Sequence, residues 1–302
     1  MFIIRNRKIF IAISTILVIA SVVMISVFGL KFGIDFKGGA QTEIGYTGAR
    51  PAADVLDASI AKLSLGEVVV QPIGDSDYVI KTRDLSAIEH QSLLSAVSVD
   101  GRFVSAEKSY TSIGPSIGNE LKHKAIWAII LVMGAIVLFI AYAFRKVSRP
   151  ISSWKYGLMA IITLVHDIAI PTGAFALISH YNGVEIDTLF IVALLTVLGL
   201  SVSDTIVVFD RIRENLKGHA GDNFAETVGK SLSQTFTRSI NTSLTVILVL
   251  LSLYFFGPAS TKTFSLVLTV GLFFGTYSSI FLASPLLVVV ERYQASRTKK
   301  RK

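Results

Sequence analysis

The chain has 302 residues, of which 52% are hydrophobic and only 17% are charged, and its mean hydropathy is +0.62. Soluble domains carry roughly 25% charged residues, so a purely water-soluble protein is excluded. The absence of cysteine excludes disulfides and thiolate metal sites. The net charge of +8 lies mainly in short segments beside apolar blocks, which indicates topology determinants rather than nucleic-acid binding.

Six apolar stretches approach or exceed the about 20 residues that a helix needs to cross a bilayer. They cover residues 9–30, 125–144, 156–180, 187–209, 240–256 and 264–290. The first follows basic residues, as in a signal peptide. Its apolar run is longer than that of such a peptide, and no small-residue cleavage site follows it. We therefore expect it to remain attached as the first of six membrane-spanning helices.

Lysine and arginine are concentrated in alternate connections between the spans, the arrangement that marks cytoplasmic segments. The basic segments contain Arg5, Arg7 and Lys8; Arg145, Lys146, Arg149 and Lys155; Arg211, Arg213, Lys217, Lys230 and Arg238; and Arg292, Arg297, Lys299, Lys300, Arg301 and Lys302. The connection around Asn182 has no basic residue, and the one around Pro258 has only Lys262. This pattern predicts that both termini are cytoplasmic and that residues 31–124 lie outside.

The predicted domains follow from these spans. Residues 1–30 form the cytoplasmic N-terminus and first helix, and residues 31–124 form an extracytoplasmic domain. Residues 125–290 form a five-helix membrane region, and residues 291–302 form a basic cytoplasmic tail.

The outer segment contains both strand and helix patterns. Strands are predicted at 41–46, 67–73, 78–82 and 102–110, and helices at 51–63 and 86–97. Ser86 is the expected N-cap of the second helix, with Glu89 three residues later. The order β-α-β-β-α-β is typical of a ferredoxin-like domain; an unrelated small α/β insert is the alternative. The predicted fold class is a six-helix membrane bundle with a small α+β ferredoxin-like domain.

Ionisable residues inside apolar spans are the strongest functional signal, because each costs at least about 2–3 kcal/mol at the centre of a bilayer. His166 and Asp167 lie in the third span, Asp204 lies in the fourth, and Arg238 precedes the fifth. Asp204 and Asp167 are candidate proton carriers, with Arg238 acting on Asp204. The alternative is structural: an aspartate caps a helix break or pairs permanently with arginine. For His166, a hydrogen bond between helices without titration is the simpler interpretation.

Small residues provide faces on which helices can approach closely. Gly199 and Ser203 are four residues apart in the fourth span, and Gly271 and Gly275 form a GxxxG motif in the sixth. These faces pack either within the chain or against a second protein.

The sequence contains no evident hydrolase, nucleotide or metal site, so we expect a protein that is not an enzyme and has no cofactor. The run 229–231 (GKS) resembles the end of a phosphate-binding loop. However, Phe224 occupies the position of the required first glycine, and no strand precedes it.

Three blocks of the chain resemble the SecF family. Residues 32–39 (FGIDFKGG) are similar to the motif at the entrance of its outer domain, with Gly33, Asp35, Gly38 and Gly39 as the matching positions. Residues 199–215 (GLSVSDTIVVFDRIREN) resemble its fourth span, and residues 234–245 (QTFTRSINTSLT) resemble the start of its fifth. The His166-Asp167 pair also fits the family. Ser203 departs from it, since asparagine usually stands there.

The resemblance implies a subunit of the Sec preprotein export pathway in the RND transporter superfamily, located in the cytoplasmic (inner) cell membrane. The implied partners are SecD, the SecYEG translocon and YajC, with unfolded preproteins as substrates and membrane lipid around the spans. The implied energy source is the proton motive force. Asp204 and Arg238 match the proton-path residues of the family, and Asp167 is a further candidate.

Two other functions fit the residues. One is an independent RND-type exporter of small molecules or lipids, although six spans and one small outer domain make only half of that architecture. The other is a scaffold of the translocon that carries no protons, against which the buried acids argue.

Overall fold

The protein is described by a computed structural model for residues 2–99, 101, 103–145, 151–218, 221 and 223–300. The chain divides into two compact units. The sheet unit comprises Phe32–Trp127 and Glu185–Thr188, and the helical unit comprises Met1–Lys31, Ala128–Val184 and Leu189–Lys302. Several residues used in the sequence predictions lie outside the described residues: Arg102, Lys146, Arg149, Arg301 and Lys302.

The sheet unit has the predicted order of elements. Its strands are β1 (Gly39–Tyr46), β2 (Val69–Ile73), β3 (Asp77–Thr82) and β4 (Ser105–Ile113), and its helices include α3 (Ile34–Lys37), α4 (Ala53–Ala61) and α5 (Ala87–Ala96). The four strands form an antiparallel sheet in the order β2-β3-β1-β4. The ferredoxin-like arrangement is therefore confirmed. Strand β4 continues to Ile113, beyond the predicted end, because it pairs along the whole of β1.

One apolar core holds the sheet against α4 and α5. Ile44 and Ile80 come from the central strands, and Leu56 and Leu93 come from the two helices; all four are fully buried. The predicted cap of α5 is also present, since the Ser86 hydroxyl accepts from the Glu89 amide and the Glu89 carboxylate accepts from the Ser86 amide. The hydrogen bond from Arg83, with those from Ser86, lowers the pKa of Glu89 to about 2.

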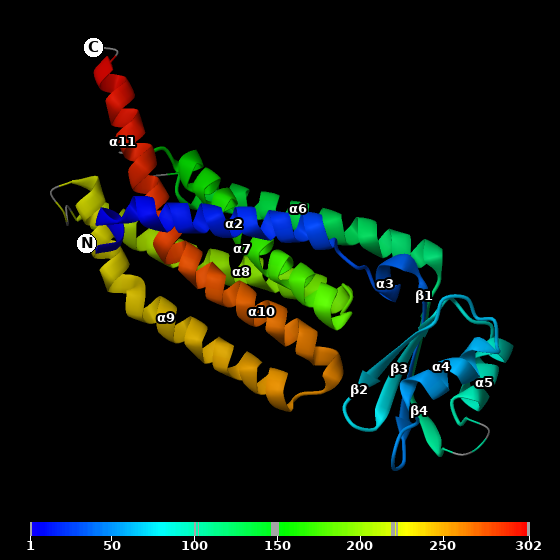
Figure 1. The fold of residues 1–302 in the computed structure, drawn as a ribbon. Coiled ribbons are helices and arrows are strands. Elements are labelled where there is room, and N and C mark those ends of the chain that lie inside the picture. The colour runs from blue at the N-terminus through cyan, green and yellow to red at the C-terminus, as the bar shows by residue number, and fades with distance from the viewer. Residues whose placement is uncertain are drawn as a thin grey trace. The chain divides into compact units, whose positions relative to one another are not determined.

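The helical unit is built from long apolar helices (Figure 1). They are α2 (Arg7–Phe28), α6 (Pro115–Ala143), α7 (Ser153–Asn182), α8 (Thr188–Lys217), α9 (Phe224–Phe256) and the continuous run α10 (Ala259–Ser278), η1 (Ser279–Ala283) and α11 (Ser284–Lys300), with the short α1 (Phe2–Arg5) before them. Within the described residues, six helices are long and apolar enough to cross a membrane, as predicted. Helix α6 begins in the sheet unit and ends in the helical unit.

Helix α9 begins at Phe224, well before the predicted span at 240–256. Its first half is amphipathic: Phe224, Val228 and Leu232 are buried in the core, and most of the remaining residues up to Ser239 are polar. Spacing by four residues places these three side chains on one face of the helix. A search for an unbroken apolar run misses such a segment.

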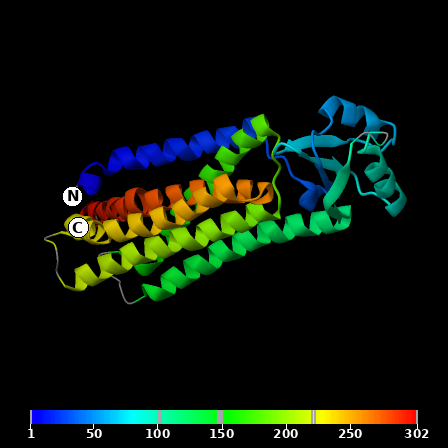
Figure 2. The ribbon, with the colours of Figure 1, turned by 90° about the horizontal axis from the view of Figure 1, so that it is seen from below.

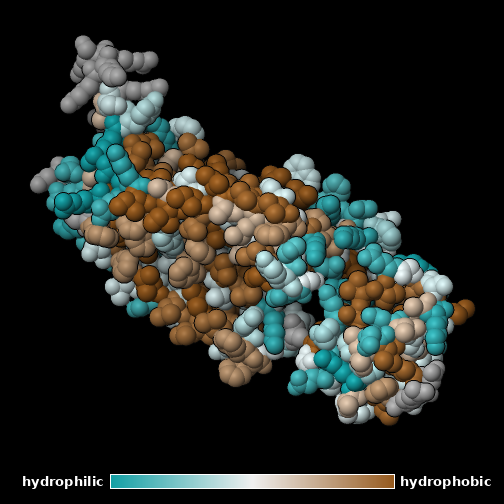
Figure 3. Space-filling model, in the orientation of Figure 1, coloured by the Kyte–Doolittle hydropathy of each residue, from teal (hydrophilic) through white to brown (hydrophobic). Residues whose placement is uncertain are grey.

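The surface of the helical unit is strongly apolar. Figure 3 shows hydrophobic side chains over the helices and hydrophilic ones gathered near the ends of α1 and α11. On α2, the exposed residues include Ile16, Ile19 and Val23, and on α6 they include Leu131 and Leu138. Contiguous exposed side chains of this kind fit contact with lipid rather than water.

The end of the helical unit that carries α1 also carries α11 and the beginning of α9. Figures 1 and 2 both show these three segments together, and α1 contacts both α9 and α11. The N-terminus and the basic C-terminal helix therefore lie at the same end of the helical unit.

Helices α8 and α10 pack closely through the glycines of the GxxxG motif. A Cβ added at Gly271 would lie 2.3 Å from Cγ2 of Val197, and one at Gly275 would lie 3.0 Å from Cβ of Ser201. This face packs within the chain. By contrast, nothing lies within 4 Å of a Cβ added at Gly199, and Ser203 on the same helix is exposed.

The close approach at Gly271 yields a stability prediction. Gly271→Ala should lower the thermal unfolding midpoint of the detergent-purified protein, since overpacking a fixed contact costs about 1–3 kcal/mol. Gly199→Ala is the matched control: it adds the same methyl group to open space and should leave the midpoint unchanged or raise it slightly. Equal midpoints for the two variants would contradict the packing described here.

Candidate functional site

The predicted acid of the third span lies in a polar cluster inside the helical unit. Asp167 of α7 is completely buried. Its Oδ1 lies 2.9 Å from Nδ1 of His166, and its Oδ2 accepts from the hydroxyls of Ser278, at 2.9 Å, and Ser201. Hydrogen bonds from α8 and α10 thus hold a carboxylate that apolar surroundings alone would make very costly.

His166 belongs to the same cluster. Its ring stacks against Tyr277, with centroids 6.2 Å apart and planes inclined by 18°. Its Nε2 is buried and has no hydrogen-bond partner among the described residues. An imidazole whose Nδ1 donates to a carboxylate keeps Nε2 as a hydrogen-bond acceptor.

Asp204 of α8 has one satisfied and one free oxygen. The hydroxyl of Ser239, on α9, donates to Oδ1. Oδ2 is buried, and within the described part of the chain it has no partner. A carboxyl group held in this way by a neighbouring helix, with one oxygen unpaired, is a candidate to bind and release a proton.

Arg238 does not pair with Asp204 in this conformation. No ion pair joins them among the described residues, and the Arg238 side chain is exposed. It lines a groove between α8 and α9 together with Asp210, Arg211 and Gln234. Ser239, the next residue on α9, makes the contact instead.

The polar residues at the end of α8 form surface ion pairs. Arg213 pairs with Asp210 at 2.7 Å, and Arg211 donates to Glu214 and to Gln234. Such exposed pairs contribute little to stability. Their position fits the interpretation of this segment as a topology determinant at the membrane surface.

Hydroxyl groups connect the surroundings of the two acids. The Ser279 hydroxyl lies 2.8 Å from the hydroxyl of Thr205, the residue next to Asp204. It also lies 3.3 Å from the carbonyl oxygen of Ser201, whose own hydroxyl donates to Asp167. Ser279 begins the π-helical turn η1; such turns occur frequently at functional sites.

Sequence reasoning missed the four serines Ser201, Ser239, Ser278 and Ser279. The available signal was the need of a buried acid for donors on other spans. The Ser278-Ser279 pair inside an apolar helix, and Ser239 beside Arg238, are hydroxyl donors of this kind.

The entrance motif lies in the sheet unit. Gly38 and Gly39 have φ values of +80° and +133°, which L side chains rarely adopt. A Cβ at Gly38 would lie 2.7 Å from Cα of Pro115, and one at Gly39 would lie 2.7 Å from the carbonyl oxygen of Thr82. Both positions therefore favour glycine. Gly33 and Asp35 contact the segment Glu185–Thr188.

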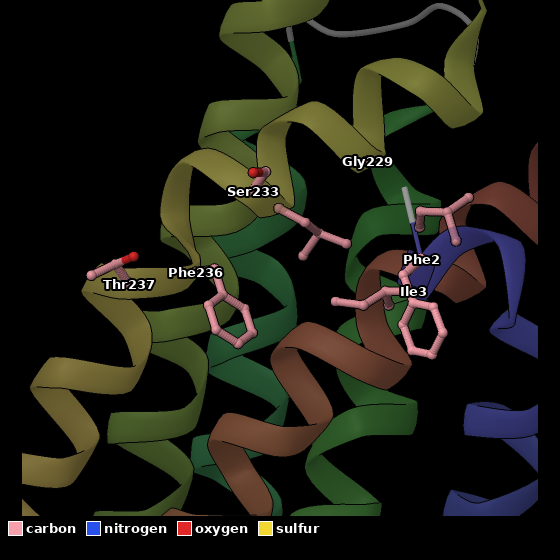
Figure 4. Close-up of a pocket in the computed structure, with 8 residues that line it drawn as sticks. Phe2, Ile3, Gly229, Ser233, Phe236 and Thr237 are labelled. Carbon is pink, nitrogen blue, oxygen red and sulfur yellow. The ribbon is translucent and has the colours of Figure 1, made fainter.

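Another groove lies between α1 and α9. Figure 4 shows Ile3 of α1 and Phe236 of α9 extending into the gap between the two helices, while Thr237 points away from it. None of its lining residues is titratable, so it offers no proton site.

Comparisons with known proteins agree over nearly the whole chain. The family described as "Protein export membrane protein SecD/SecF, C-terminal" matches residues 96–293, and the family described as "SecD/SecF GG Motif" matches residues 23–49. The second range contains Gly38 and Gly39.

Curated relatives are named "Protein translocase subunit SecF". The one from Thermobaculum terrenum is 43% identical over 95% of this chain and 92% of its own length. The one from Anaerolinea thermophila is 34% identical over 96% and 94%, respectively. These names describe a transport role rather than an enzyme.

Two solved structures of SecDF have the same fold. The crystal structure of the translocon-associated SecDF from Thermus thermophilus matches 96% of this chain at 30% identity, with a TM-score of 0.82. A super-membrane-facing form matches 99% at 29% identity, with a TM-score of 0.71. This chain spans only 38% and 40% of those chains. The chain belongs to the SecD/SecF family of protein export membrane proteins, and the curated relatives that match it are SecF subunits.

Proposed function

We propose that this protein is the SecF-type subunit of a complex with SecD that uses the proton motive force to assist export of unfolded preproteins through SecYEG. YajC is a further proposed partner. The supporting observation is the carboxyl group of Asp204, which is held on one oxygen by Ser239 and is unpaired on the other.

In the proposed cycle, Asp204 binds a proton on Oδ2 and later releases it. The deprotonated carboxylate keeps the Ser239 hydroxyl and attracts the guanidinium of Arg238 from the adjacent position on α9. Protonation removes the charge and frees Arg238, so α8 and α9 can shift relative to each other. Asp167, which accepts from the hydroxyls of Ser201 and Ser278 and lies beside His166, is the second proton site of this proposal.

A SecD partner is supported by the polar surface that this chain leaves uncovered on two membrane helices. On α8, Gly199 faces open space and Ser203 is exposed. On α9, the exposed polar residues include Arg238, Asn241, Thr242 and Thr245. Polar side chains and small-residue faces in membrane helices normally contact other helices rather than lipid.

The proposed orientation places both termini in the cytoplasm and the sheet unit outside, in the cytoplasmic (inner) cell membrane. Basic residues support it, since α1, the beginning of α9 and α11 lie together and three of the four basic segments of the membrane region lie in or beside them.

Cysteine labelling tests this orientation in a chain that has no cysteine of its own. Asp75→Cys and Ser260→Cys should react with an impermeant maleimide added outside intact cells, and Gly218→Cys should react only after permeabilisation. Labelling of Gly218→Cys in intact cells would contradict the orientation.

The proton role is tested by Asp204→Asn, which keeps size and hydrogen bonding but cannot titrate. In membrane vesicles, this variant should lose the increase in preprotein translocation that an imposed proton gradient produces. Asp210→Asn is the matched control, because Asp210 lies on the same helix but is exposed at its end; it should keep the full increase.

Assembly is checked in the same preparations. Both variants should co-purify with SecD in mild detergent. An Asp204→Asn variant that assembles and still responds fully to the gradient would refute the proton role. A chain that supports export without any SecD-like protein would refute the partnership.

A further inference from the structure

The segment Glu185–Thr188 lies between two membrane helices in the sequence but belongs to the sheet unit. It follows α7, which carries Asp167, and its last residue is the first residue of α8, which carries Asp204. Three contacts within the sheet unit hold this segment.

The first contact is made by the backbone of the entrance motif. The amide of Gly33 donates to the carbonyl oxygen of Ile186 over 2.8 Å, and Phe32 and Ile186 form a parallel β-bridge. Ile186 is only 2% exposed. A Cβ at Gly33 would lie 3.0 Å from the same carbonyl oxygen, so glycine permits this approach.

The second contact caps α8 from a distant part of the chain. Oδ2 of Asp35 accepts from the backbone amide of Thr188 at 2.7 Å and from its hydroxyl at 2.6 Å. The first amides of a helix have no partner within the helix, and a negative charge there is favourable. Asp35 therefore caps the N-terminus of α8, although it lies in the entrance motif and not directly before the helix.

The third contact joins the segment to the sheet itself. Nζ of Lys81, on β3, lies 2.7 Å from Oε2 of Glu185, and the side chains are only 17% and 26% exposed. Partial burial reduces the screening of this ion pair by water. The segment is thus held by both the entrance motif and a central strand.

We propose that these contacts form a clamp through which the sheet unit positions the beginning of α8, and that Asp35 and the Lys81–Glu185 pair are positioning residues for Asp204. Helix α8 runs without interruption from Thr188 past Asp204, a length of roughly 24 Å at 1.5 Å per residue. A displacement of the clamp therefore moves the whole helix, and with it Asp204. This inference rests on the proposed function and names the residues that hold the beginning of α8.

Charge reversal tests the ion pair of the clamp in the complete complex with SecD. Lys81→Glu and Glu185→Lys should each lose most of the gradient-dependent increase in translocation, while gradient-independent translocation and assembly with SecD persist. The double reversal restores the pair and should restore the increase. Asp57→Lys changes charge equally at an exposed position of α4 and should resemble the wild type.

The cap is tested by a pair of substitutions at Asp35. Asp35→Asn retains an accepting oxygen and should keep much of the increase, whereas Asp35→Ala should not. In parallel, amide hydrogen exchange of the full-length protein should be faster in the first turn of α8 for Asp35→Ala and Glu185→Lys, and should return to the wild-type rate in the double reversal.

The outcomes separate this inference from the proposed function. If amide hydrogen exchange at the beginning of α8 is unchanged in both Asp35→Ala and Glu185→Lys, the clamp is overturned, regardless of the result for Asp204→Asn. Faster exchange with a full gradient response, while Asp204→Asn loses its response, would overturn only the coupling. A full response in Asp204→Asn would overturn the proton role and the coupling with it, and exchange would still decide whether the clamp exists.

Discussion

The helical unit depends on one constraint: a carboxyl group in apolar surroundings must find its hydrogen-bond partners within the protein. Asp167 meets this need with donors from three helices, including Ser201 and Ser278. The two helices that carry these hydroxyls, α8 and α10, also approach each other closely at Gly271 and Gly275. The same two helices therefore provide both the close packing of small residues and the hydroxyl groups that bind Asp167.

Asp204 meets the constraint only in part, because only one of its carboxylate oxygens accepts a hydrogen bond among the described residues. Asp167 is completely buried and bonded on both oxygens, whereas Asp204 has one free oxygen and lies near an exposed arginine. In the proposed cycle, proton binding changes the charge at Asp204, and Asp167 provides the second proton site. The clamp at Glu185–Thr188 then connects this change to the sheet unit through α8.

Much of the architecture could be predicted from the sequence because strong, local patterns determine it. Apolar runs mark the spans, and alternation with a Ser86–Glu89 cap marks the elements of the sheet unit. The first half of α9 was not predicted as part of the helix, because polar and apolar residues alternate with helical spacing there. The acids were found by their cost in a membrane, but Ser239 and Ser279 were not, since their role depends on which helices meet. For the same reason, the sequence did not show that Asp35 caps a helix that begins more than a hundred residues later.

The central claim, that Asp204 binds and releases a proton, is tested most directly by infrared difference spectroscopy of the purified protein in lipid bilayers. Acidification should produce the C=O stretching band of a protonated buried carboxyl group in the wild type and in Asp210→Asn. The account predicts that a component of this band is missing in Asp204→Asn. Identical spectra for wild type and Asp204→Asn across the whole pH range would contradict it.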